Sequence, residues 1–145
     1  MKKFGLIGKT LSHSFSKNYF GEKVEKENIT DAQYELYELA DCKELLDLIS
    51  ANKSDLRGLN VTIPYKQDVL PYLKEIDPAA KKIGAVNVLK INTDGEIKGY
   101  NSDYYGFLTS LENFAGAALK DCKALILGTG GASKAVKQAL IDLNI

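Results

Sequence analysis

The chain is poor in the residues that build metal sites and nucleophile–histidine catalysts. It has one histidine, His13, and two cysteines, Cys42 and Cys122, in 145 residues. The single histidine argues against a histidine-based metal site and against a Ser-His triad, and the cysteines lack metal-type spacing. We therefore expect no bound metal. In a reducing compartment a disulfide between the two cysteines is not expected either.

The chain also lacks an excess of charge of one sign and a long apolar run. Nineteen basic and nineteen acidic residues give a formal net charge of zero, which argues against nucleic acid and anionic membrane surfaces as partners. No apolar run approaches the roughly 20 residues of a membrane-spanning helix. The start, Met1–Phe4, leads into a short strand and not into the apolar core of a signal peptide. We therefore expect a cytoplasmic protein that binds neither nucleic acid nor membranes.

What the chain does have is an alternation of strand-like and helix-like segments. The patterns predict strands at 3–8, 34–39, 58–63 and 123–128, a hairpin over 86–101, and helices near 15–28, 42–52, 66–74, 103–115 and 132–143. Strands that alternate with helices imply a mostly parallel open sheet with right-handed crossovers. The expected fold class is therefore α/β, with helices flanking the sheet and one antiparallel strand from the hairpin.

The strand expected at 58–63 stops at Pro64, which cannot continue a central ladder. Ligands of open α/β sheets bind in the crevice outside the carboxyl ends of the strands. Asn60, Thr62 and Lys66 place two neutral hydrogen-bonding groups and one ammonium near this edge. The alternative interpretation is a structural strand with a solvated lysine, and for a lone lysine that interpretation would be the better one.

A carboxylate follows the second arm of the hairpin. Asp94-Gly95 supplies the turn, and Asp103 opens an apolar-periodic stretch after the second arm. Asp103 or Ser102 is therefore expected at a helix N-cap, which is the structural alternative for this residue. An ammonium and a carboxylate at strand ends can also form an acid/base pair that holds a substrate hydroxyl and passes a proton. This pair makes Lys66 and Asp103 the candidate catalytic residues.

A glycine-rich turn joins the last expected strand to the last expected helix. It reads G-x-G-G-A-S, from Gly128 to Ser133. Glycines let the backbone approach a phosphate, and a helix N-terminus presents unpaired N–H groups. Turns of this kind also occur without ligands. A dinucleotide-binding fingerprint requires a strand before the turn and a helix after it, and both are expected here.

Together these segments resemble the shikimate dehydrogenase family. The resemblance rests on five ordered motifs that span nearly the whole chain: Ser12–Ser16 after the first strand, N-V-T-x-P-x-K at 60–66, G-A-V-N at 84–87, G-x-N-[ST]-D-x-x-G at 99–106, and the cofactor loop at 128–133. Two places depart from the family. Lys17 stands where a proline is usual, and Phe20-Gly21 stands where a histidine–asparagine pair often follows.

The resemblance implies a reversible, NADP-dependent reduction of 3-dehydroshikimate to shikimate in the shikimate pathway, with NAD left open as the cofactor. It implies that Lys66 and Asp103 are catalytic and that Ser14 and Ser16 bind the substrate carboxylate, with helix capping as the alternative role of the serines. Further residues complete the expected site: Thr62 and Asn87 for the ring hydroxyls, and Gly128, Gly130, Gly131, Ala132 and Ser133 for the cofactor pyrophosphate.

Members of this family run well past Ile145, so we interpret the chain as an N-terminal fragment. We expect a substrate-binding and catalytic domain at 1–102, a connecting helix at 103–116, and the truncated start of a Rossmann-like NAD(P)-binding domain at 117–145. A single strand and helix cannot bury both faces of a sheet. We therefore expect a stable core at 1–115 and a tail that is mobile or pairs with another copy as a homodimer. Quinate as substrate, and an inactive substrate-binding module, remain alternatives.

Overall fold

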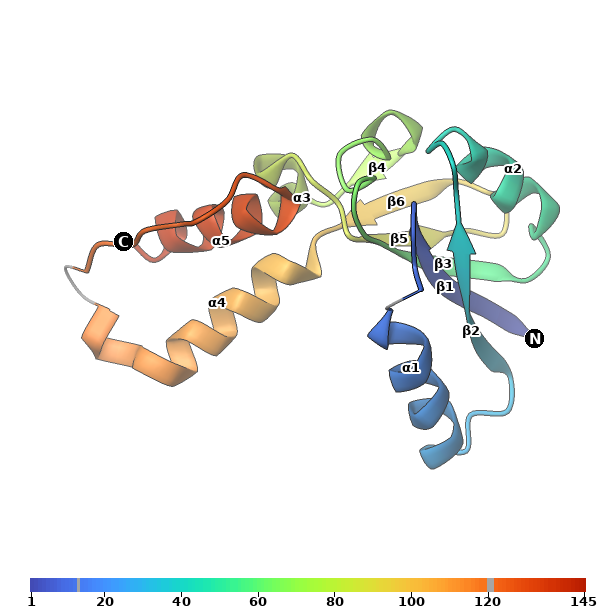
Figure 1. Ribbon diagram of the computed structural model, residues 1–145, viewed down its shortest axis with the longest axis horizontal. Coiled ribbons are helices and arrows are strands. Elements are labelled where there is room, and N and C mark those ends of the chain that lie inside the picture. Colours follow the sequence, from blue (N-terminus) through green and yellow to red (C-terminus); the bar gives the residue numbers. More distant parts are fainter. Residues whose placement is uncertain (13, 120–121) are drawn as a thin grey trace.

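The computed structural model of the chain describes residues 1–12, 14–119 and 122–145, and its centre is an open six-stranded sheet (Figure 1). The strand order is β2-β1-β3-β5-β6-β4. The strands are β1 (Lys2–Gly8), β2 (Ala32–Glu38), β3 (Leu56–Val61), β4 (Glu75–Ile76), β5 (Val88–Ile91) and β6 (Ile97–Tyr100). β1 is parallel to β2 and β3, β4 is parallel to β6, and β5 is antiparallel to both its neighbours. The expected mostly parallel sheet with one antiparallel strand is confirmed.

Helices lie on both faces of the sheet and beyond its far end (Figure 1). They are α1 (Phe15–Lys26), α2 (Glu44–Ala51), α3 (Pro78–Ile83), α4 (Ser102–Ala115) and α5 (Gly131–Asp142), with short 3₁₀ turns at Leu70–Tyr72 and Gly116–Leu119. α1 packs against β1 and β2 on one face. α2 packs on the opposite face. None of the helices in the described part of the chain is long and apolar enough to cross a membrane.

The main core fills the space between the sheet and α2. Leu45 and Ile49 of α2 contact a cluster that includes Leu59 and Val61 of β3, and each of these four side chains is at most 5% exposed. Burying a leucine or valine side chain stabilises a fold by about 1.5–3 kcal/mol. β3 is therefore held firmly at the end from which the chain turns toward Lys66.

A second, smaller core joins α3, α4 and α5, and Figure 1 shows α4 and α5 side by side, away from the sheet. Its buried members are Ile83, Ala85, Tyr104, Ala135 and Ala139. The Tyr104 hydroxyl donates a hydrogen bond to Asp142 Oδ2 at 2.7 Å. This bond, together with burial, raises the pKa of Tyr104 to about 12, and it lowers the pKa of the Asp142 carboxyl. α5 is thus attached to α4 by apolar packing and by one polar contact.

The prediction of a helix near 66–74 is wrong. Residues 63–69 form consecutive turns, and only Leu70–Tyr72 is helical, as one 3₁₀ turn. Pro71 lies inside the expected helix, where it removes an N–H donor and clashes with the preceding turn. Neither β4 nor α3 was predicted from the sequence. The signals for α3 were present, because Asp77 caps it, Pro78 begins it and Gly84 ends it with a φ of 69°.

The prediction of a strand at 123–128 is also wrong, because these residues form no strand in the structure. The helix expected at 132–143 does form, as α5. Of the strand and helix expected at 123–143, only the helix is therefore formed, with the glycine-rich segment before it.

Candidate active site

Lys66 lies in the turn that follows β3, and two contacts hold its position. The Val86 backbone N–H donates to the Lys66 carbonyl at 2.7 Å, which ties this turn to the segment before β5. The side-chain stem passes close to the start of α5, because a Cβ built on Gly131 would lie 3.1 Å from Lys66 Cδ. The Lys66 side chain is 16% exposed. Its stem is therefore packed while its ammonium still reaches a surface.

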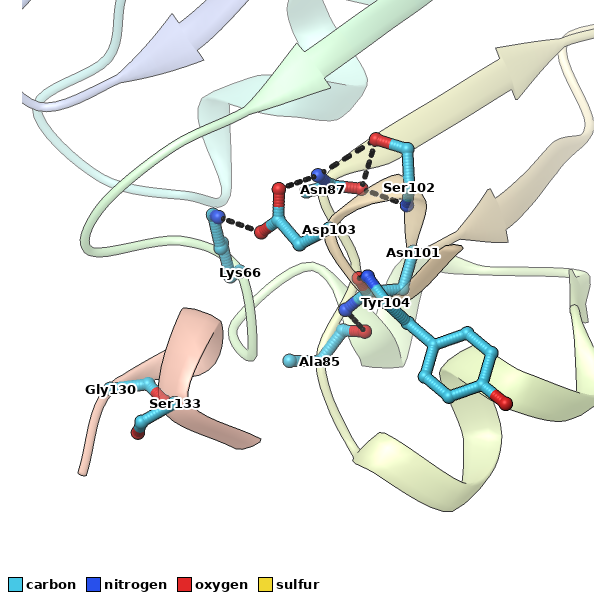
Figure 2. Close-up of polar contacts among 9 residues, drawn as sticks. All are labelled: Lys66, Ala85, Asn87, Asn101, Ser102, Asp103, Tyr104, Gly130 and Ser133. Carbon is cyan, nitrogen blue, oxygen red and sulfur yellow. Dashed lines mark hydrogen bonds and ion pairs between the residues drawn. The ribbon is translucent and has the colours of Figure 1, made fainter. Parts of the chain in front are cut away.

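Lys66 and Asp103 form an ion pair, as the sequence predicts. Lys66 Nζ donates to Asp103 Oδ2 at 2.6 Å (Figure 2). The predicted capping role of Asp103 or Ser102 is wrong, because Asn101 is the N-cap and its Oδ1 accepts from the Tyr104 backbone N–H at 3.1 Å. Asn101 Nδ2 donates to the Ala85 carbonyl at 3.0 Å in a fully buried site. Since Asn101 caps α4, the Asp103 carboxylate remains available for Lys66.

Asn87 completes the network around the Asp103 carboxylate (Figure 2). Its Nδ2 donates to Asp103 Oδ1 at 2.7 Å and to Ser102 Oγ at 3.0 Å, while its Oδ1 accepts from the Ser102 backbone N–H at 2.8 Å. Its own backbone is tied into the sheet, because Asn87 N donates to the Tyr100 carbonyl and Val61 N donates to the Asn87 carbonyl. The two Asp103 oxygens therefore have different partners, and the carboxylate is held in one orientation.

The other expected substrate residues line one cleft beside this network. Its volume is about 650 Å³, and its lining includes Ser14, Ser16, Thr62, Lys66 and Asn87. Ser14 is the N-cap of α1 and accepts from the Ser16 backbone N–H at 3.3 Å, so Ser14 caps the helix, and not Ser16, for which that role was expected. His13, which directly precedes Ser14 in the sequence, lies outside the described residues. The structure therefore brings together residues from three separate motifs.

The glycine-rich turn lies on the other side of Lys66. Figure 2 shows Gly130 and Ser133 at the start of α5, near Lys66. The Ser133 hydroxyl donates to the Gly130 carbonyl at 2.7 Å, and Lys134 Nζ donates to Gln67 Oε1 at 2.6 Å. A Cβ at Gly131 would crowd the Lys66 stem, so glycine allows this close approach. Two segments far apart in sequence thus meet at the candidate proton donor.

Some residues around the site were not assigned a role from the sequence. Asn101 was missed, although asparagine directly after a strand and before an apolar-periodic run is a typical N-cap. Ser102 was considered only as a cap, whereas its hydroxyl and N–H both contact Asn87. No three histidine, cysteine, aspartate or glutamate side chains come together as metal ligands within residues 1–12, 14–119 and 122–145.

Known proteins with similar sequences cover the whole chain. A shikimate dehydrogenase (NADP(+)) of Clostridium beijerinckii is 44% identical over 147 residues, and the match covers 100% of this chain and 53% of the relative. A shikimate dehydrogenase (NADP(+)) of Methanosphaera stadtmanae is 41% identical, and the match covers 97% of this chain and 48% of that relative. The chain therefore spans about half the length of these curated relatives.

Solved structures show the same fold. Shikimate dehydrogenase 1 from Peptoclostridium difficile has a TM-score of 0.83 at 40% identity, and the match covers 98% of this chain and 53% of that one. Shikimate 5-dehydrogenase from Thermus thermophilus, in complex with NADP(H) and shikimate, has a TM-score of 0.85 at 32% identity, over 100% of this chain and 54% of that one. The family described as the shikimate dehydrogenase substrate binding domain matches residues 6–89. This chain belongs to that family.

Proposed function

We propose that this chain forms the substrate-binding half of an NADP-dependent shikimate dehydrogenase, which reversibly reduces 3-dehydroshikimate to shikimate in aromatic amino acid biosynthesis. The observation that carries the proposal is the Lys66–Asp103–Asn87 network at a cleft lined by Ser14 and Ser16. In this proposal residues 1–102 bind substrate and carry the catalytic groups. Residues 103–116 connect this domain to the cofactor domain, which begins at 117.

The chemistry assigned to the network is proton transfer at one oxygen of the substrate. When bound, NADPH would supply the hydride. As the substrate carbonyl is reduced, negative charge develops on its oxygen, and the Lys66 ammonium stabilises this charge and donates the proton. An ammonium has three donors, and one of them bonds Asp103 Oδ2. The other two can be donated to the substrate oxygen, while the bond to Asp103 keeps Nζ in place.

The remaining cleft residues suit a cyclic polyol that carries a carboxylate. The hydroxyls of Ser14 and Ser16 can donate to the carboxylate. Thr62 and Asn87 each offer both a donor and an acceptor, which suits ring hydroxyls. In the structure both N–H groups of the Asn87 amide are donated, to Ser102 and Asp103, so a bond from Asn87 to a ring hydroxyl would replace one of these two.

The residues present fit the cofactor pyrophosphate in part. A Cβ at Gly128 or Gly130 would meet nothing within 4 Å, so the turn has open space above its backbone. α5 begins at Gly131, and the first N–H groups of a helix favour phosphate. The strand that would carry the turn is not formed. We propose that Gly128, Gly130, Gly131, Ala132 and Ser133 hold the pyrophosphate once that strand pairs with the rest of a cofactor domain.

The test combines binding with turnover. Isothermal titration calorimetry of this chain with shikimate should show binding, and quinate should bind more weakly.

A fusion of residues 1–145 to the C-terminal half of the Clostridium beijerinckii relative should reduce 3-dehydroshikimate with NADPH. Asp103→Asn in the fusion should lower both affinity and rate while the fold survives, because the N-cap is Asn101. An active fusion whose kinetics do not change with Asp103→Asn would reduce Asp103 to a structural residue.

A second candidate applies to the 145-residue chain alone, namely a substrate-binding module without turnover. The observation that favours it is the unformed strand at 123–128, where Leu125 and Leu127 are 85% and 88% exposed. A cofactor domain is not assembled around them. Measurable NADPH oxidation by the purified chain would exclude this candidate. The homodimer and the cytoplasmic location stay predictions, which a sizing measurement and cell fractionation would test.

A further inference from the structure

Tyr34 of β2 lies on the α1 face of the sheet, beside the cleft but not in its lining. Its hydroxyl donates to Asn60 Oδ1 at 2.8 Å. Its ring stacks on Phe20 of α1, with the centroids 4.5 Å apart and the planes 21° from parallel. Phe20 and Asn60 line the cleft, and together with Tyr34 they also line an apolar hollow of about 400 Å³ between α1 and the sheet. Tyr34 therefore touches the site only through its neighbours.

The bond from Tyr34 engages the oxygen end of the Asn60 amide. A carbonyl oxygen can only accept, so the phenol must be the donor in this bond. Burial raises the pKa of Tyr34 to about 12, against the opposing effect of a hydrogen bond with Ser16, and the phenol therefore stays protonated at neutral pH. Asn60 Oδ1 is thus occupied, and its Nδ2 group remains.

Asn60 Nδ2 is open to solvent. Within the described part of the chain it has no acceptor, and no buried side-chain nitrogen or oxygen there lacks a hydrogen-bond partner. An Nδ2 group without a partner must therefore be reached by water. Asn60 lines both the cleft and the apolar hollow, and a polar ligand in the cleft could accept from this pair of donors.

We propose that Tyr34 is a positioning residue, which fixes the Asn60 amide so that Nδ2 donates to an oxygen acceptor of the ligand in the cleft. The proposal rests on the proposed function, since it takes that ligand to be shikimate. Without the phenol hydroxyl the amide can turn by half a rotation and present Oδ1, which cannot donate to a hydroxyl or carboxylate oxygen. The Phe20 ring restricts the phenol to the orientation that makes the bond.

A measurement without ligand tests the bond itself. The Asn60 side-chain amide signals of the ¹⁵N-labelled chain should shift in Tyr34→Phe, which removes only the hydroxyl and keeps the ring on Phe20. Tyr37→Phe is the matched control, because Tyr37 is on the same strand and packs against the main core on the other face. Unchanged Asn60 signals in Tyr34→Phe would overturn the proposal, whether or not the chain binds shikimate.

A double-mutant cycle tests the role in binding. Tyr34→Phe should weaken shikimate binding by about 3- to 10-fold, the worth of one net hydrogen bond, while Tyr37→Phe leaves it unchanged. In an Asn60→Ala background Tyr34→Phe should have no further effect, because there is no amide left to orient. The same loss in both backgrounds would overturn the proposal and make Tyr34 a general structural residue.

The amide NMR measurement and the binding cycle together distinguish failure of this proposal from failure of the proposed function on which it rests. If neither the wild-type chain nor the fusion binds shikimate, the substrate assignment fails, and the amide signals still decide whether Tyr34 orients Asn60. If binding is normal and the cycle shows no coupling, the proposed function stands and the role of Tyr34 falls. In the fusion, Tyr34→Phe should raise KM and leave kcat within about threefold, since the Asn60 amide contacts ligand and does not move the proton.

Discussion

Segments 58–63 and 123–128 are both predicted as strands, but only the first forms a strand in the structure. Residues Leu56–Val61 form β3, where Leu59 and Val61 are each 2% exposed. Residues 123–128 form no strand, and there Leu125 and Leu127 are 85% and 88% exposed. Both segments contain strand-forming apolar residues and end at a proline or a glycine, so local sequence predicts a strand in each.

The difference shows that a strand depends on its neighbours. β3 pairs with β1 on one side and β5 on the other, so its backbone groups are satisfied and its apolar face meets α2. The described residues provide no such neighbours for 123–128. α5 instead buries Ala135, Ala139 and Leu140 as it packs near α3 and α4. The expectation that the stable core ends at 115 is therefore wrong for α5, while the expected pairing with a second copy stays a prediction.

The largest expected effect concerns Lys66, the proposed proton donor, which follows the paired strand β3. Lys66→Ala in the fusion should lower kcat by about 100- to 10,000-fold, the usual cost of removing a general acid, with a much smaller change in KM. Steady-state kinetics measures both. Lys134→Ala is the control from the C-terminal region, because Lys134 bonds Gln67 and not the network. A loss of less than tenfold in Lys66→Ala would exclude Lys66 as the proton donor.

Leucine truncations test the comparison directly. Leu59→Ala should lower the free energy of unfolding of the chain by about 2–5 kcal/mol, because it leaves a cavity in the main core. Leu127→Ala should change it by less than about 0.5 kcal/mol, since this side chain is exposed. Urea unfolding followed by circular dichroism measures both. Equal losses in the two variants would show that 123–128 is buried in solution, by pairing with another copy or otherwise.

Replacing the serines of the cleft should change the affinity for shikimate more than the stability of the chain. Ser14→Ala and Ser16→Ala should each weaken shikimate binding by roughly 1.5–3 kcal/mol, since each removes a hydrogen bond to a charged group. Ser14→Ala should also lower the stability of the chain by about 1 kcal/mol, because Ser14 caps α1. Calorimetry and thermal unfolding separate the two effects. Ser110→Ala, at an exposed serine of α4, should change neither, and unaltered affinity in both cleft variants would remove the serines from the site.

The smallest effect concerns the contact between α4 and α5. A hydrogen bond from Tyr104 lowers the pKa of Asp142, so the ionised carboxylate stabilises the fold above its unfolded-state pKa. This contribution is lost as the pH falls through the lowered value. Tyr104→Phe should raise the pKa of Asp142 toward its usual value, as followed by carboxyl ¹³C NMR. Tyr105→Phe, the half-exposed neighbour, should leave it in place. An unmoved Asp142 titration in Tyr104→Phe would mean that α5 is not attached in this way in solution.

The sequence by itself determined the elements whose signals are local or carried by motifs. The α/β class, β1 to β3, the hairpin around Asp94-Gly95 and helix α4 follow from periodicity and turn residues. The Lys66–Asp103 pair follows from strand ends that meet at one sheet edge. These features are predictable because hydrophobic period and turn chemistry are local, and because right-handed crossovers in an alternating α/β chain bring the carboxyl ends of parallel strands to one edge.

Only the tertiary structure decided which of several local options each segment takes. Asn101 caps α4 in place of Asp103 because its amide also bonds the buried Ala85 carbonyl, a partner 16 residues away that no local pattern names. Tyr34 meets Asn60 because β1 lies between β2 and β3 in the sheet order. Segment 123–128 remains unpaired because strand formation requires hydrogen-bonding partners from elsewhere in the fold. Cross-strand contacts and long-range packing energies arise only when the whole chain is assembled.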